Sequence, residues 1–231
     1  MQFLQFGEWV LRLIYGIKLV KTNKDKERLL PLFEEVYNTI KEKENYKNNH
    51  IKLYIDKSMT VNAYAIGTGT ISITRGVIDT LTDNQIKGLL AHEFGHIIHG
   101  DTLIPLILIV GNLFLLLAFL TIKMLELMAI FVEEIMGDNS KLFSSVIKGI
   151  LNIGLFLIVQ IIQILILINR RKNEYKADDF SFEAGYRDDL LETLYILKKI
   201  DLGGKMSLLE RIKSSHPNID DRISRLEGKD I

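Results

Sequence analysis

The sequence predicts an α+β fold that is mainly helical, with a small antiparallel sheet and an inserted two-helix transmembrane hairpin. Three observations support this fold class. The apolar spacing changes from helical to alternating and back along the N-terminal half. Two runs of about 20 residues lack any charged side chain, the length that a helix needs to cross a bilayer core. Between the sheet and the first run, a capped helix carries two histidines on one face.

Composition limits the possible chemistry. The 231 residues contain 29 basic and 29 acidic side chains, so the basic patch expected of a nucleic-acid-binding protein is not indicated. The chain has no cysteine, which excludes disulfides, thiolate metal sites and a cysteine nucleophile. A bound metal would therefore be held by histidine and carboxylate side chains.

Residues 1–50 are expected to form an N-terminal helical segment. Phe3–Val20 is apolar but lacks the form of a signal peptide, because charged residues interrupt it at Glu8, Arg12 and Lys18. We expect a helix that either packs on the body of the protein or lies at a membrane surface. Lys24–Asn49 has helical apolar spacing and predicts a second helix.

Residues 51–102 are expected to form a sheet and the helix that follows it. Ile51–Ile55 alternates between apolar and polar residues, as strands do. Val61–Ile66 predicts a second strand, and the turn Gly67–Thr70 leads into a returning strand at Ile71–Thr74. Together these segments predict a small antiparallel sheet.

The following helix contains an H-E-x-x-H motif. Thr82 and Gln85 form a capping-box pattern at its start, and we expect it to end at Gly100. His92 and His96 project from one face of a helix, so both can bind one Zn²⁺. Glu93 is then free to act as general base on a water that the zinc activates.

Residues 103–168 are predicted to form the transmembrane hairpin. Its two uncharged runs are Leu103–Ile122 and Gly149–Ile168, joined by a slightly acidic loop. Three basic residues follow the second run, Arg170, Arg171 and Lys172. The positive-inside rule therefore places both chain ends and the catalytic histidines on the cytoplasmic side of the cell membrane. The alternative is a pair of buried core helices.

Residues 169–231 are expected to complete the metal site. A catalytic zinc ion usually has three protein ligands and one open position. Because the chain lacks cysteine, the third ligand must be His, Asp or Glu, and Glu174 is the best candidate. It starts a helix just beyond the second apolar run, and a hairpin returns the chain to the side that it left.

Further polar residues are candidates around this site. Asp178 lies one turn beyond Glu174 and is placed to accept the second N–H of a zinc-binding histidine, unless Asp179 takes that role or Asp178 forms an ordinary salt bridge. His216 is a candidate donor to the developing oxyanion, with helix capping or packing as the alternative. Arg222 would support His216 or pair with Asp178.

Two further features have functional interpretations. His99 is expected to be structural, because a fourth ligand would close a catalytic zinc site. The strand that contains Asn62, Ala63 and Tyr64 is expected to bind an extended substrate by backbone pairing, if it lies at a sheet edge. Asn62 would add a side-chain hydrogen bond, and an interior strand is the alternative.

These residues resemble the membrane-bound zinc metallopeptidases of the HtpX and Ste-type CAAX protease family. The resemblance rests on four features in order: N-A-Y-A, H-E-F-G-H followed by H-G-D, N-R-x-x-E-Y-x-A-D, and S-H-P with a downstream R-I. It implies a gluzincin-like fold at a membrane surface. It also implies Glu174 as third zinc ligand, Asp178 as partner of a zinc histidine, and His216 and Arg222 as active-site residues.

The chain departs from the family in its membrane segments. HtpX-like enzymes typically have two spans before the catalytic domain, and Ste-type enzymes have several more that enclose a chamber. This sequence has no convincing span before residue 50, so it resembles a minimal member.

The leading hypothesis is an endopeptidase with one Zn²⁺ per chain, held in the lipid bilayer by the hairpin. It would cleave membrane or membrane-associated polypeptides on the cytoplasmic side. One alternative is a CAAX-type processing protease of lipidated C-termini. Others are a non-catalytic membrane zinc scaffold or sensor, and a soluble protein that partly exposes its apolar runs.

Overall fold

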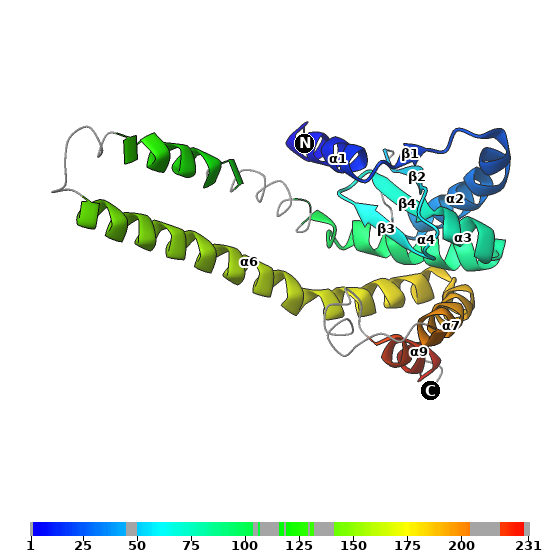
Figure 1. Ribbon diagram of the computed structural model, residues 1–231. Helices are drawn as coiled ribbons and strands as arrows, with labels where there is room; N and C mark the ends of the chain where they lie inside the picture. Colours follow the sequence, from blue (N-terminus) through cyan, green and yellow to red (C-terminus); the bar gives the residue numbers. More distant parts are fainter. Residues whose placement is uncertain are drawn as a thin grey trace. The chain divides into compact units, whose positions relative to one another are not determined.

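Figure 1 shows the computed structural model, which describes residues 2–44, 50–103, 106, 116–117, 119–128, 130–131, 141–203 and 218–228. The chain divides into two compact units. The first unit consists of Met1–Leu106 and Arg170–Ile231, and the second is Ile107–Asn169. The predicted ligands His92, His96 and Glu174 all belong to the first unit.

A four-stranded sheet forms one part of the first unit. Its order is β1 (Lys18–Leu19), β2 (Lys52–Asp56), β4 (Thr70–Thr74) and β3 (Ala63–Ile66). β3 and β4 are antiparallel neighbours, as are β1 and β2. β2 and β4 run parallel, with Leu53 opposite Ile71. The sheet is therefore mixed, and β3 is one of its two edge strands.

The prediction of an antiparallel sheet was wrong at this parallel pairing. Alternating apolar residues identify a strand, but they do not specify its neighbour. All five residues of β4 are buried, so this strand occupies a central position between β2 and β3. After β2 the chain passes the position that β4 later fills and forms β3 at the edge of the sheet. It then returns antiparallel to β3 as β4, which therefore runs parallel to β2.

The N-terminal helix is shorter than the predicted apolar segment. α1 spans Gln2–Ile14, and the chain then turns at Gly16, whose φ is 64°. A positive φ favours glycine, because it has no Cβ to clash with the backbone. The residues expected to extend the helix to Val20 instead contribute β1, which pairs with β2.

The two helices predicted before and after the sheet segments are present, and they pack against each other. α2 spans Asn23–Glu44, and residues 45–49 of its predicted range lie outside the described residues. α4 spans Asp83–Ile98 and begins with the predicted capping box of Thr82 and Gln85. The short α3 (Arg75–Thr80) precedes α4 and was not predicted. Buried Phe94 of α4 stacks on Tyr37 of α2, with ring centroids 5.5 Å apart.

The C-terminal helices cover the other side of α4. α6 spans Lys141–Ala184 without interruption. The prediction that a new helix starts at Glu174 was therefore wrong. The stretch that follows the second apolar run has no Gly or Pro before Gly185, so nothing breaks the helix there. α7 (Arg187–Gly203) and α9 (Ile219–Glu227) then pack together through a small apolar cluster, which includes Leu190 and Leu226.

The second unit contains helical residues 119–128 and the first part of α6. The prediction of a loop between residues 122 and 149 was wrong where the chain is described, because residues 123–128 and 141–148 are helical. Asn152 donates a hydrogen bond to Glu126, 3.4 Å away, which joins the two helical segments. The local cause is the helix-compatible sequence K-M-L-E-L-M, in which Lys123 pairs with Glu126 at 2.8 Å.

The described residues contain no helix that is both long enough and apolar enough to cross a membrane. Most of the predicted span Leu103–Ile122 lies outside the described residues. Gly149–Ile168 is helical as part of α6, but the side chains of residues 161–168 are not described. The transmembrane hairpin therefore stays a prediction.

α4 approaches its neighbours closely at two glycines. A Cβ on Gly88 would collide with the backbone nitrogen of Leu190 and lie 2.6 Å from the carbonyl carbon of Asp189. A Cβ on Gly95 would lie 3.0 Å from Cα of Ala177 in α6. Larger residues here would push α6 and α7 away from the helix that carries both histidines.

We expect Gly88→Ala to lower the free energy of unfolding by about 3 kcal/mol, the upper end of typical overpacking costs. Denaturant titration of the purified chain measures this change. Gly228→Ala is the matched control, because a Cβ there has no atom within 4 Å and the residue has φ −75°. Equal stability of the two variants would contradict the close approach of α4 and α7.

Candidate metal centre

The two motif histidines lie together on the buried part of α4. Their Nε2 atoms are 3.2 Å apart, and their rings meet edge to face at 87°. His92 is 3% exposed, while His96 is partly accessible. The spacing of one helical turn accounts for this arrangement, because residues four apart share a helix face.

α6 brings the carboxylate of Glu174 to the same point. Its Oε2 lies 3.6 Å from Nε2 of His92, and its Oε1 lies 3.7 Å from Nε2 of His96. Zn–N bonds of about 2.0–2.1 Å at tetrahedral angles place ligand atoms roughly 3.3–3.4 Å apart. The three side chains therefore form a group whose spacing fits one tetrahedral metal ion, with one position left for another ligand.

The far side of each imidazole faces a carboxylate. Nδ1 of His92 is 2.9 Å from Asp178, and Nδ1 of His96 is 3.4 Å from Asp101. A carboxylate partner assigns the proton to Nδ1, so a neutral ring presents its Nε2 lone pair to the centre. Two lone pairs and the Glu174 carboxylate then converge, an arrangement that only a cation makes favourable.

Arg222 of α9 joins the carboxylates from the other side. It donates from Nε and Nη2 to both oxygens of Asp178, at 2.8 and 2.6 Å. Its Nη1 also lies 3.3 Å from Oε2 of Glu174. Since Arg222 is 5% exposed, its guanidinium holds two carboxylates in place from within the protein.

The charges around the site favour a divalent cation. Glu93, Glu174 and Asp178 are buried carboxylates, and Arg222 is the buried cation beside them. With His92 neutral, as it is when it binds a metal, these three negative charges and one positive charge leave two negative charges in surroundings that penalise unbalanced charge. A bound divalent ion would balance them.

The pKa values of two residues in this cluster reflect the charges around them. Burial and the Arg222 guanidinium lower the pKa of His92, but the Asp178 and Glu174 carboxylates outweigh them and raise it to about 9. Burial raises the pKa of Asp178, but Arg222 and His92 outweigh it and lower the pKa to about 2. Asp178 is therefore ionised at neutral pH, and metal binding at His92 would displace a proton.

Comparison with known proteins identifies the family. The model of peptidase family M48 matches residues 25–230. The chain belongs to peptidase family M48. The predicted resemblance to the HtpX and Ste-type family is therefore confirmed. Membership of this family, together with the HtpX protease relatives, supports protease activity for the chain.

Two relatives of this M48 chain are distant but match over most of it, and a third matches a shorter part more closely. The protease HtpX homolog of Methylacidiphilum infernorum (isolate V4) is 24% identical, and the match covers 97% of this chain and 80% of that protein. The homolog from Bacillus subtilis (strain 168) is 23% identical, covering 98% and 79%. The protease HtpX of Legionella pneumophila (strain Corby) is 43% identical, but over only 24% of this chain and 21% of its own.

A solved structure has the same fold. The crystal structure of S. mikatae Ste24p matches with a TM-score of 0.52 at 17% identity. The match covers 94% of this chain and 52% of that chain, so this M48 chain spans about half the length of Ste24p. At this identity the likeness concerns the fold alone.

The remaining predicted residues lie in different places. Asp179 pairs with Arg225 at 2.6 Å, while Asp178 faces His92, so the two neighbouring carboxylates have separate partners. His99 is exposed at the C-terminal cap of α4, with its ring at 84° to that of Phe180 and outside the metal-binding group. His216 lies outside the described residues, and its role stays a prediction.

The predicted substrate strand is at the edge of the sheet. Ala63 and Tyr64 belong to β3, and Asn62 directly precedes it. The backbone of Asn62 is held by Thr74, which donates its N–H to the Asn62 carbonyl at 3.0 Å. The Tyr64 hydroxyl donates to Asp56 at 2.8 Å, and burial raises the pKa of Tyr64.

Asp101 has a place in the site that the sequence analysis did not assign. Its carboxylate faces His96 from the turn that follows α4. The available signal was the H-G-D tripeptide, which puts a carboxylate shortly after the second histidine. Gly100 in that tripeptide has φ 73°, a conformation that turns the chain back toward the helix.

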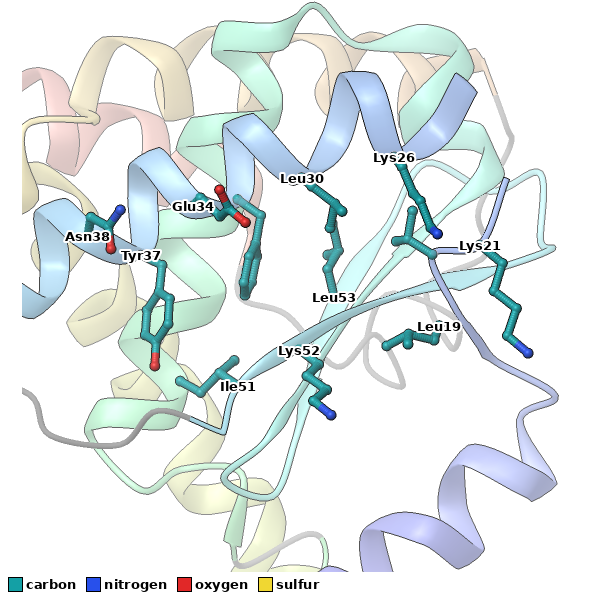
Figure 2. Close-up of a pocket in the computed structure, with 12 residues that line it drawn as sticks. Leu19, Lys21, Lys26, Leu30, Glu34, Tyr37, Asn38, Ile51, Lys52 and Leu53 are labelled. Carbon is teal, nitrogen blue, oxygen red and sulfur yellow. The ribbon is translucent and has the colours of Figure 1, made fainter. Parts of the chain in front are cut away.

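A separate cavity of about 910 Å³ lies between α2 and the β1–β2 side of the sheet (Figure 2). Apolar side chains such as Leu30 and Leu53 line it, and Lys21, Lys26 and Lys52 stand at its margin. None of the metal-site residues lines this cavity. The cavity is therefore separate from the candidate metal centre.

We expect Glu174→Ala to weaken zinc binding by more than about 100-fold, since loss of a supporting carboxylate alone typically costs about 10- to 100-fold. Competition with a chelating dye measures the affinity. Glu183→Gln is the matched control, because it removes an exposed carboxylate from the same helix. Unchanged affinity in Glu174→Ala would remove this residue from the ligand set.

We expect Arg222→Lys to weaken zinc binding about 10- to 100-fold, because an ammonium group does not chelate a carboxylate with two parallel hydrogen bonds. The matched control is Arg225→Lys on the same helix, which changes the exposed contact with Asp179. Measuring zinc affinity across pH distinguishes a role of Arg222 in positioning the ligands from a general loss of protein stability in the variant. If both variants bound zinc like the wild type at every pH, Arg222 would not position the ligands.

Proposed function

We propose that this M48 chain is a zinc-dependent endopeptidase. The observation that carries the proposal is the convergence of His92, His96 and Glu174 at one point, with Glu93 on the same helix. Asp178 and Asp101 face the two histidines, and Arg222 contacts Asp178 and Glu174, which supports a site built to hold one ion. A zinc ion held there would polarise a peptide carbonyl and lower the pKa of a water molecule.

Glu93 is the proposed general base. It is 5% exposed and follows His92 directly on α4. In this role its carboxylate accepts a proton from the attacking water and delivers it to the leaving amine. Surroundings of low dielectric constant strengthen the interaction of this carboxylate with the developing charges.

The edge strand β3 is the proposed binding surface for the substrate backbone. β4 pairs with one edge of β3, so the second edge is the one at which an extended peptide would add as a further strand. α4 packs against β3, which brings this strand close to the helix that carries the histidines. In this arrangement Ala63 and Tyr64 pair with the substrate backbone, and Asn62 adds a side-chain hydrogen bond.

His216 and Arg222 have different proposed roles. We assign His216 the donation of a hydrogen bond to the developing oxyanion, as the sequence analysis predicted. Arg222 is buried against Asp178 and Glu174, so we assign it the positioning of these carboxylates instead of contact with substrate. This role explains why an arginine far along the chain belongs to the site.

The proposed substrates are membrane or membrane-associated polypeptides. Relatives over most of the chain are named as HtpX proteases, and the sequence has two long uncharged runs. Anchoring by the hairpin Leu103–Ile122 and Gly149–Ile168, with the site on the cytoplasmic side, belongs to the same proposal.

We expect Glu93→Gln to retain zinc but to lower kcat by about 10²- to 10⁴-fold, because glutamine has a similar shape and cannot accept the proton. Cleavage of an unfolded membrane protein and bound zinc are measured on the same preparation. Glu34→Gln, an exposed carboxylate of α2, is the control and should cleave at the wild-type rate.

Wild-type cleavage by Glu93→Gln would remove the general-base assignment. Loss of zinc together with activity would instead give Glu93 a structural role. Absence of peptide cleavage by the zinc-loaded wild-type chain would contradict the proposed function itself.

A further inference from the structure

The charged side chains of α1 face the protein. α1 contains two charged residues, Glu8 and Arg12, and both contact the sheet. The Glu8 carboxylate is 3% exposed and accepts hydrogen bonds from the Thr68 N–H at 2.7 Å and the Thr70 hydroxyl at 3.1 Å. Arg12 donates to Thr70 at 2.8 Å and lies over the Tyr54 ring at 5.2 Å.

The turn between β3 and β4 is shaped to receive this carboxylate. A Cβ on Gly67 would collide with the Glu8 side chain, and a Cβ on Gly69 would lie 3.2 Å from its Oε2. Gly67 also has φ 58°, which a residue with a Cβ rarely adopts. These contacts set the rotation of α1 about its own axis, with Glu8 turned inward.

The opposite face of α1 is apolar and exposed. Phe6, Trp9, Leu13 and Ile14 are 58%, 53%, 68% and 67% exposed. The Phe6 and Trp9 rings stack with centroids 5.9 Å apart, so they form one continuous surface. A helix that faces water normally turns its charged side outward and its apolar side inward. α1 shows the reverse, which indicates that its outer face meets an apolar medium.

The exposed charged side chains that follow α1 in the chain, as far as Lys24, are positive. Cationic side chains occur at Arg12, Lys18, Lys21 and Lys24, and the three lysines are exposed. The acidic residue of this stretch is Glu8, which is buried. Apolar and aromatic residues flanked by exposed lysines are characteristic of helices that lie in the headgroup region of anionic membranes.

We propose that α1 lies in the plane of an anionic phospholipid bilayer, with Phe6, Trp9 and Leu13 inserted among the acyl chains near the headgroups. Lys18 and Lys21 then contact the lipid phosphates. Such helices insert their apolar face about 5–10 Å. This inference is independent of zinc and peptidase activity, since it concerns a surface outside the metal centre.

Trp9 is the single tryptophan of the chain, so its fluorescence reports on α1 without a mutation. The full chain is reconstituted into vesicles of equal parts phosphatidylcholine and phosphatidylglycerol, some with bromine at shallow and others at deep acyl positions. We expect strong quenching by the shallow bromines, weak quenching by the deep ones, and protection from aqueous iodide. Vesicles of phosphatidylcholine alone should give less quenching, because the lysines lose their anionic partners.

A matched pair of variants tests the face itself. Leu13→Glu places a charge on the exposed side of α1, and we expect it to lose most of the shallow quenching of Trp9. Met59→Glu is the control, because Met59 is 69% exposed, close to the 68% of Leu13, but lies in the loop between β2 and β3. This control should be quenched like the wild type, and circular dichroism of both variants checks that they fold.

Three outcomes would overturn the proposal. Iodide access to Trp9 that is equal in vesicles and in detergent would leave the face in water. Shielding of Trp9 that depends on protein concentration and not on brominated lipid would assign the face to a second copy of the chain. Stronger quenching by the deep bromines would mean that α1 does not lie near the headgroups. All three readings are independent of whether the chain cleaves peptides.

Discussion

The buried contact between Arg222 and Asp178 is the interaction on which the candidate metal centre depends. It joins α9 to α6, and Asp178 in turn orients His92 on α4. Charges so far from water are costly unless each has a partner. Here the Arg222 guanidinium contacts both Asp178 and Glu174. One cation therefore holds Glu174, a potential metal ligand, and Asp178, which orients the potential ligand His92. Close packing of α4 against α6 at Gly95, and against α7 at Gly88, keeps these segments within reach, because α7 packs on α9.

A second polar contact links the N-terminal helix to the sheet. Glu8 binds the turn that connects β3 to β4, and β3 is the strand proposed to bind substrate. A helix held by its charged side has its apolar side available for a bilayer. If α1 lies at the membrane surface, the turn between β3 and β4 joins the proposed substrate strand to that surface. Substrate binding and membrane attachment would then share the β3–β4 hairpin.

Sequence reasoning was accurate for local features and failed for pairings and breaks. The capping box at Thr82 and the hairpin of β3 and β4 follow from adjacent residues, and both are present. The parallel pairing of β2 with β4 was missed, because alternation along a strand contains no information about its neighbour. The unbroken course of α6 was missed because a change from apolar to charged residues was taken as a helix boundary, although no Gly or Pro stands there.

By itself the sequence determined the chemistry of one helix turn. His92, Glu93 and His96 share α4, and the absence of cysteine restricted any further ligand to histidine or carboxylate. Glu174 was predicted from its place just beyond the second apolar run and from the family resemblance, but its separation of 3.6 Å from His92 is a result of the tertiary structure. Tertiary structure also placed Arg222 on two carboxylates and turned the polar side of α1 inward. The physical reason is that a side chain's direction within its own helix follows from residue spacing, whereas the side chains that it meets depend on how separate elements pack.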